Sequence, residues 1–179
     1  ISGQGQILQL EQIGSRISLS GDPDLNSLGE ALHTFYAADR QEYENGKRIN
    51  MAADILVRWQ CKECIKPEQI VQSADALQNW VQNNYSQAAW KREFPVMQRL
   101  QSGTYVFGFV DLLLETRNNM VIVDHKVFPG SVQEVRNKSQ EFMGQLAAYR
   151  QCLEALDSSR SIVCYLHYPV VGYVVRIET

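Results

Sequence analysis

The sequence has 179 residues, the length of one ordinary domain. Hydrophobic residues make up 45% of it and charged residues 21%, which is typical of a globular protein, and no apolar run approaches the roughly 20 residues that cross a bilayer. The net charge of −3 excludes a protein that holds nucleic acid through an overall basic excess. The four cysteines are too few for a disulfide scaffold and predict a reducing, cytoplasmic compartment.

The first half of the chain predicts a short hairpin followed by helices. Residues 6–22 have the pattern of a β-hairpin. Residues 24–43 have apolar side chains at helical spacing and predict a helix that is capped by Asn26 or Ser27. Residues 50–85 predict two further helices with a break between them at a proline.

The second half of the chain predicts strands around one long helix. Residues 91–100, 103–115 and 119–127 are rich in β-forming residues and are separated by polar turns. Residues 132–156 predict a helix, and residues 160–178 predict two more strands. This order of elements indicates an α/β or α+β sheet core with an N-terminal helical layer.

Two of the predicted strands carry charged residues among apolar ones. Asp111 lies in "GFVDLLLE", and Asp124 and Lys126 lie in "MVIVDHKV". Because side chains alternate along a strand, Asp124 and Lys126 share a face, and a hairpin would place Asp111 across from or diagonal to Asp124. Two partly buried carboxylates this close repel one another. A shared proton, a cation such as Lys126, or a divalent metal would relieve the repulsion, and spacing alone does not choose between them.

These strands resemble the signature of the PD-(D/E)xK nucleases. Asp111 corresponds to the first acid of that signature, and residues 124–126 correspond to its D-x-K element. Upstream, "LGEALHTFY" is similar to the Gly-x-x-x-His helix of the RecB-like branch and contributes His33. Downstream, "GQLAAYRQCL" is similar to the Q-x-x-x-Y motif of that branch, with Gln145 and Tyr149 on one helix face.

The resemblance runs from about residue 8 to the C-terminus and is closest to the nuclease domain of AddA- and RecB-type helicase–nucleases. It implies an α/β fold with a restriction-endonuclease-like mixed sheet flanked by helices, in a single domain over residues 1–179. The first residue is Ile1 rather than Met, so we expect the chain to be a C-terminal piece of a larger helicase–nuclease.

The resemblance also implies a site for Mg²⁺ (or Mn²⁺). Its ligands would be the side chains of His33, Asp111 and Asp124 and the backbone carbonyl of His125. Lys126 would orient the attacking water or stabilise charge on the phosphate. Gln145 and Tyr149 would position the substrate backbone. Glu93 could be a further acid near the site, or simply a charge at a strand edge.

The resemblance implies a DNA nuclease, which we expect to be an exonuclease. A helicase domain in the same chain and a partner helicase–nuclease subunit would supply single-stranded ends during double-strand-break processing in recombinational repair. Two other readings stay open: a standalone nuclease from a phage or mobile element, and a non-catalytic DNA-binding or interaction module with a nuclease fold. The cysteines do not have the arrangement of the iron–sulfur cluster found in some relatives, and buried small residues or a metal–thiolate site both remain possible for them.

Overall fold

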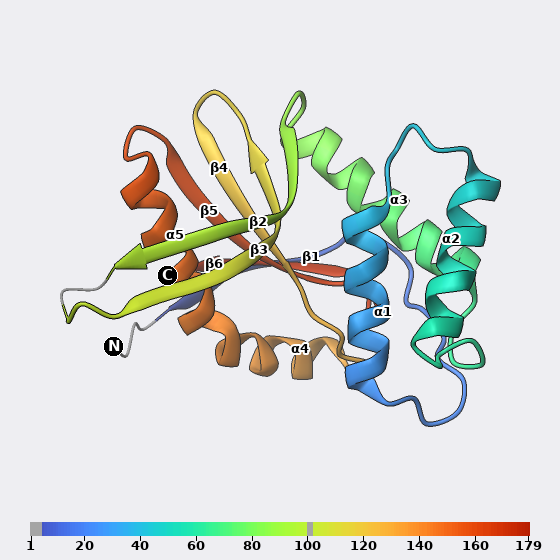
Figure 1. The fold of residues 1–179 in the computed structure, drawn as a ribbon. Coiled ribbons are helices and arrows are strands. Elements are labelled where there is room, and N and C mark those ends of the chain that lie inside the picture. The colour runs from blue at the N-terminus through green and yellow to red at the C-terminus, as the bar shows by residue number, and fades with distance from the viewer. Residues whose placement is uncertain (1–4, 100–101) are drawn as a thin grey trace.

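Six strands form one mixed sheet in the order β1-β6-β5-β4-β3-β2 (Figure 1). The computed structural model describes residues 5–99 and 102–179. The strands are β1 (Gln6–Gln12), β2 (Ala89–Arg99), β3 (Tyr105–Glu115), β4 (Asn119–His125), β5 (Ser161–Tyr168) and β6 (Tyr173–Glu178). All neighbouring pairs are antiparallel except β4 and β5. That parallel pair requires a crossover, which the helices between the two strands provide.

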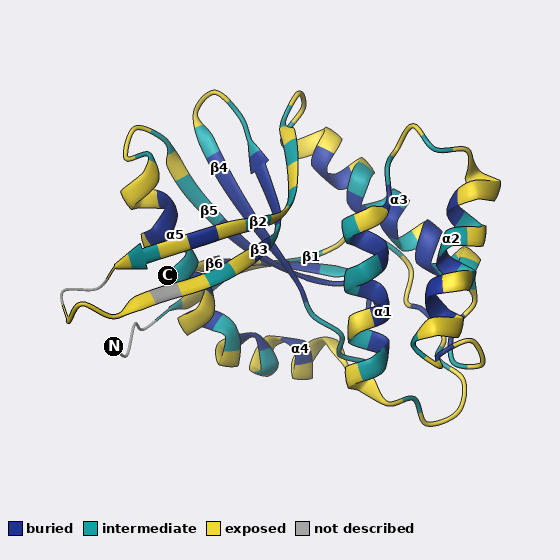
Figure 2. Cartoon of the chain, in the orientation of Figure 1, coloured by how far each residue is buried: buried dark blue, intermediate teal, exposed yellow. Residues whose placement is uncertain are grey.

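Helices cover both faces of the sheet. On one face lie α1 (Leu25–Ala38), α2 (Asn45–Arg58) and α3 (Pro67–Asn84); α4 (Val132–Ser139), the short 3-10 helix η1 (Gln140–Phe142) and α5 (Met143–Leu156) lie on the other. Each face has its own apolar core, and the central strands are almost wholly buried (Figure 2). The predicted α/β class, with helices flanking a mixed sheet and an N-terminal helical layer, is confirmed. No helix in the described part of the chain is long and apolar enough to cross a bilayer.

Two predictions about the N-terminal region were wrong. Residues 6–22 do not form a hairpin, because β1 pairs with the distant strand β6 and the backbone amide of Ile17 then donates to the carbonyl of Val170. The cap of α1 is Asp24, whose carboxylate accepts hydrogen bonds from the backbone amides of Asn26 and Ser27. An N-cap carboxylate satisfies amides that have no partner within the helix.

The helix predicted over 132–156 is broken at η1. The hydroxyl of Ser139 donates to the carbonyl of Val135 and also bonds the hydroxyl of Tyr168 on β5. A serine that bonds back to the preceding turn competes with the helical ladder and bends the helix. The break separates α4 from α5, which carries Gln145 and Tyr149.

A buried ion triad holds the N-terminal helical layer together. Arg48 on α2 is 6% exposed and donates two hydrogen bonds of 2.8 Å to the carboxylate of Asp39, at the end of α1. Its third contact is a hydrogen bond of 2.6 Å to Asp75 on α3. The three helices are therefore fixed relative to one another by a single guanidinium, and α1 presents His33 to the sheet.

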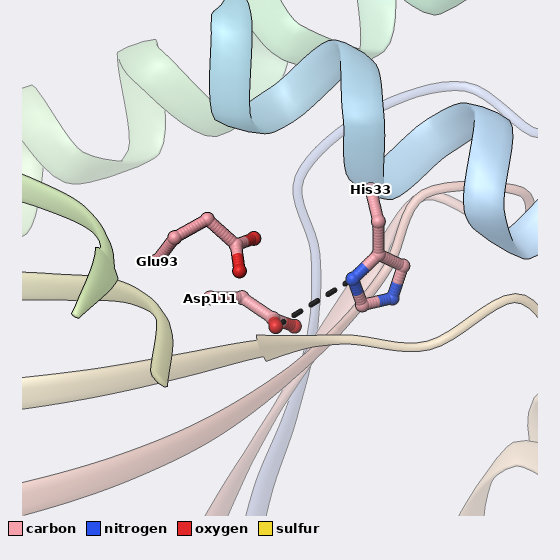
Figure 3. A group of neighbouring side chains, drawn as sticks. All are labelled: His33, Glu93 and Asp111. Atoms are coloured by element: carbon pink, nitrogen blue, oxygen red, sulfur yellow. Dashed lines mark ion pairs between the residues drawn. The ribbon is translucent and has the colours of Figure 1, made fainter. Parts of the chain in front are cut away.

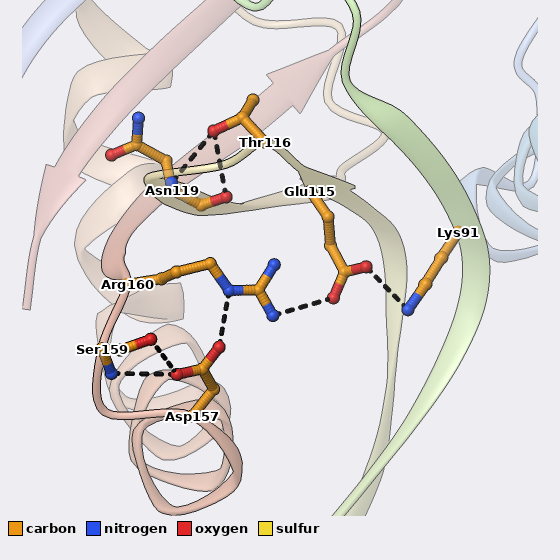
Figure 4. Close-up of polar contacts among 7 residues, drawn as sticks. All are labelled: Lys91, Glu115, Thr116, Asn119, Asp157, Ser159 and Arg160. Carbon is orange, nitrogen blue, oxygen red and sulfur yellow. Dashed lines mark hydrogen bonds and ion pairs between the residues drawn. The ribbon is translucent and has the colours of Figure 1, made fainter.

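A second polar network surrounds Glu115, the last residue of β3 (Figure 4). The carboxylate of Glu115 forms ion pairs with Lys91 on β2 at 2.7 Å and with Arg160 at 3.3 Å. Arg160 also pairs with Asp157 at 2.7 Å, which connects the loop after α5 to the sheet. The strands that carry Asp111 and Asp124 are thus restrained at the end remote from those acids.

Replacing Arg48 by methionine should destabilise the protein strongly, since it leaves two carboxylates without their cation. We expect the free energy of unfolding in urea to fall by about 3 kcal/mol. Arg58, an exposed arginine on the same helix, provides the control. Arg58→Met should change that free energy by less than about 0.5 kcal/mol, and equal losses in both variants would contradict the role assigned to the triad.

Candidate active site

Asp111 and Asp124 lie where the ladder between β3 and β4 ends. The last residue pair in that ladder is Leu112 with Val123, and the two aspartates are the next residue on each strand. Here the carboxylate of Asp111 takes the place of a strand carbonyl and accepts a hydrogen bond of 2.7 Å from the backbone amide of His125. The expected proximity of the two acids thus arises from the hairpin itself.

At the level of Asp111, the strands β2 and β3 exchange the faces that they present to the two apolar cores. Leu112 packs in the core beneath α1–α3, whereas Val110, two residues away, packs in the core beneath α5. On β2, Trp90 and Phe94 are divided between the two cores in the same way. Glu93 lies between them with a φ of 49°, a left-handed conformation that is uncommon for a residue other than glycine. The register is continuous on both sides of this point, so Glu93 lies across from Asp111.

A histidine and two acids meet at this reversal (Figure 3). His33 from α1, Glu93 from β2 and Asp111 from β3 each offer a ligand atom within 4.8 Å of the others. His33 Nδ1 lies 3.5 Å from Asp111 Oδ1, and its Nε2 lies 2.9 Å from the carbonyl oxygen of His125. His33 and Glu93 also line an open depression of about 490 Å³ between α1 and β2. The structure therefore brings together three of the predicted ligands and adds Glu93.

The electrostatics of this group favour a cation. Burial lowers the pKa of His33, but the hydrogen bond and the charge of Asp111 outweigh burial and raise it overall. Burial raises the pKa of Asp111, but the hydrogen bond from His33 and the neighbouring imidazoles lower it overall. Both ring nitrogens of His33 face acceptors, an arrangement that only the protonated ring satisfies. A positive charge is thus stabilised between Asp111 and the His125 carbonyl.

Asp124 lies outside that group and begins a second polar chain. Lys126 Nζ is 2.6 Å from Asp124 Oδ2 and donates a hydrogen bond of 3.1 Å to Gln145 Oε1. Gln145 then donates a hydrogen bond of 2.9 Å to the hydroxyl of Tyr149. The Tyr149 ring covers Gly108, where a Cβ atom would lie 2.8 Å from Cε1 of that ring. All four side chains are predicted site residues, and they form one continuous row.

Asp124 is a buried carboxylate with Lys126 as its ion-pair partner. It is 1% exposed, and its Oδ2 lies 2.6 Å from the ammonium of Lys126 in a buried ion pair. Burial, and then the charge of Asp111, raise the pKa of Asp124 to about 6. A buried carboxylate that has one lysine as its cation and feels the charge of Asp111 suits a hard divalent cation such as Mg²⁺ or Mn²⁺.

The ring of His125 takes no part in this group. It stacks on Tyr36 with 4.5 Å between ring centroids, and its Nδ1 lies 2.9 Å from Nδ1 of His167. Burial lowers the pKa of His125 to about 4, so the ring is neutral at physiological pH. Side chains alternate along β4, so the His125 ring lies on the face opposite Asp124 and Lys126, while its backbone carbonyl faces His33.

The cysteines form no metal site within the described residues. All four are free, and the one group of potential metal ligands found there contains no cysteine. Burial raises the pKa of the Cys61, Cys152 and Cys164 thiols, which keeps them protonated. Cys61, Cys152 and Cys164 are buried, and Cys64 is partly exposed.

One contact at the site was not foreseen. The ammonium of Lys126 lies 4.6 Å from the centroid of the Phe142 ring, a distance that allows a cation–π interaction. Phe142 falls within the helix predicted over residues 132–156, and its side chain also packs against the core beneath α5. Phe142 is the last residue of η1, and no pattern in the sequence marks the helix break there.

The site therefore defines an α/β protein with a histidine–carboxylate cluster beside a lysine. No family model matches the chain, and no curated protein matches it. Among solved structures, the chain is similar to one described as "Crystal structure of SSO0001", with 12% sequence identity and a TM-score of 0.31 over 83% of this chain and 73% of that chain. A similarity at this level supports no argument about function.

The replacement Asp124→Asn tests the burial of this carboxyl, because the amide has a similar size and cannot ionise. The pKa of Asp124 is raised from 3.8 to about 6, so the folded state binds this proton more tightly than the unfolded chain does. The resulting stabilisation is complete below pH 3.8 and is lost as the pH rises through about 6. In EDTA, we expect the variant to gain roughly 2–3 kcal/mol relative to the wild type between pH 4 and pH 7. A difference that does not vary with pH in urea unfolding would contradict this placement of Asp124.

Proposed function

We propose that this chain is a metal-dependent DNA nuclease domain of the RecB-like PD-(D/E)xK type, which hydrolyses phosphodiester bonds. One observation carries the proposal: the cluster of His33, Glu93 and Asp111 lies beside the buried pair of Asp124 and Lys126. The motifs predicted to act together lie far apart in the sequence, and chance similarity of short motifs would not bring their side chains to one place. Their convergence also accounts for acids placed in apolar strands.

In this proposal, each side chain has a definite part. His33, Asp111 and Asp124 and the carbonyl of His125 hold Mg²⁺ (or Mn²⁺), with Glu93 as a further oxygen ligand. The bound ion would polarise the scissile phosphate and lower the pKa of an attacking water. A ligating imidazole must present an unprotonated ring nitrogen, so a bound ion would take the place of one ring proton of His33.

Lys126 and α5 act on the other side of the acids. Lys126 compensates the charge of Asp124 and carries protons that can orient a water or stabilise charge on a phosphate oxygen. Its hydrogen bond to Gln145, and the bond from Gln145 to Tyr149, fix the direction of the ammonium group. Gln145 and Tyr149 would also contact the substrate backbone.

The resemblance extends the proposal to a biological setting. The domain would work in the cytoplasm as an exonuclease on single-stranded DNA ends, with a helicase domain in the same chain and a partner helicase–nuclease subunit. Its role would be the processing of double-strand breaks in recombinational repair. A standalone nuclease would share the same chemistry at the site.

The test is cleavage of linear single-stranded DNA with Mg²⁺, Mn²⁺ or EDTA. We expect metal-dependent cleavage by the wild type and a loss of at least about a hundredfold in Asp111→Asn and in Lys126→Met, since each removes a charge that acts on the reacting phosphate or its metal. Asp54→Asn and Lys62→Met change exposed residues on the helical layer and should cleave at the wild-type rate.

Circular dichroism melting in EDTA shows whether each variant is folded. If folded Asp111→Asn cleaves as fast as the wild type, the assignment of the site is wrong. If the wild type neither binds a divalent ion nor cleaves DNA, the chain is a non-catalytic module instead.

A further inference from the structure

The outer half of the β2–β3 hairpin carries an exposed aromatic surface. β3 has Tyr105, Phe107 and Phe109 at alternate positions, and their cross-strand partners on β2 are Arg99, Met97 and Pro95. We call these six residues the hairpin stripe. All six are exposed, and Tyr105, Phe107 and Met97 each expose more than half of their surface, at 59%, 62% and 64%. Exposed apolar groups gathered on one face mark a binding surface more often than a solvated one.

The opposite face of the hairpin explains why the stripe faces solvent. Val96 and Val110 are buried there, and Phe94 packs against the same core. The Tyr149 ring covers Gly108 on that side. Alternation therefore turns the stripe away from α5, beyond the helices that cover the inner part of the sheet (Figure 1).

The stripe leads directly to the acids of the site. Glu93 and Asp111 are the next positions of the same alternation, one on each strand. An extended ligand lying along the stripe would reach His33, Glu93 and Asp111 at its inner end. At its outer end, the guanidinium of Arg99 lies 6.0 Å from the centroid of the Tyr105 ring, where it can meet an anionic backbone.

From this arrangement we propose that the hairpin stripe is a stacking platform for the bases of single-stranded DNA that enters the site. The inference rests on the proposed function. A chain with a net charge of −3 and a carboxylate-rich site repels phosphates, so its affinity must have another source. Stacking of bases on aromatic rings supplies affinity without charge and without sequence preference. In a duplex the base faces are covered by neighbouring bases, which makes the platform selective for single strands.

Fluorescence anisotropy of labelled oligothymidylate at about 50 mM salt in EDTA measures this binding without cleavage. We expect Phe107→Ala to weaken binding roughly tenfold. Phe107→Tyr keeps a ring and should bind like the wild type, whereas Phe107→Leu keeps only apolar bulk and should be as weak as alanine. Val57→Ala removes a side chain that is 59% exposed on α2 and should have no effect. An abasic oligomer of equal length and charge should bind the wild type at least as weakly as oligothymidylate binds Phe107→Ala, because it cannot stack on any ring of the stripe.

Three results would overturn the platform: no binding by the wild type, wild-type affinity in Phe107→Ala, or full affinity in Phe107→Leu. The last would indicate an apolar docking face for a protein. Because binding is measured in EDTA, the platform and the nuclease can fail separately. Binding that depends on Phe107 without any metal-dependent cleavage would refute only the nuclease, and cleavage that is indifferent to Phe107 would refute only the platform.

Discussion

The hydrogen bond from the backbone amide of His125 to the carboxylate of Asp111 is the contact on which the rest of the site depends. It replaces a rung of the β3–β4 ladder at the point where strand pairing ends. It directs one acid of the pair towards His33 and leaves the carbonyl of His125 facing the same imidazole. Asp124, on the neighbouring strand, is left with Lys126 alone. A single irregular rung thus gives two neighbouring carboxylates different partners, His33 for Asp111 and Lys126 for Asp124.

This arrangement destabilises the protein locally, and the rest of the fold compensates. Asp124 is buried with a raised pKa, and Glu93 has a left-handed backbone, each of which costs free energy. The strands bearing these residues are anchored on both apolar cores and by the Glu115 network at their far end. The Arg48 triad fixes α1, so that His33 keeps its distance from Asp111. Rigid support of this kind is what a site with closely spaced charges requires.

The sequence predicted most of the fold and the chemical character of the site, for reasons that are local. Alternation in β4 placed Asp124 with Lys126 and turned the ring of His125 away, and helical spacing placed Gln145 beside Tyr149. What it missed depends on contacts over long distances. The partner of β1 is the last strand of the chain, and next to the break at η1 Ser139 bonds Tyr168 on the distant strand β5. For Glu93 the sequence left two alternatives, an acid near the site and a charge at a strand edge, because no propensity encodes the reversal of faces that brings it to His33. The hairpin stripe was visible as alternating aromatic residues, but that pattern is equally typical of a buried strand.

The central claim is that these residues bind one divalent cation, and calorimetric titration with Mn²⁺ tests it most directly. At about pH 7.5, well above the raised pKa of Asp124, we expect a single site in the wild type. Glu93→Gln should weaken Mn²⁺ binding at that site. Asp111→Asn should weaken it at least about tenfold, because each change removes a carboxylate that contributes to holding the ion. Asp54→Asn should titrate like the wild type. If the wild type binds no Mn²⁺, or if Asp111→Asn binds it as tightly as the wild type, the cluster of His33, Glu93 and Asp111 is not a metal centre.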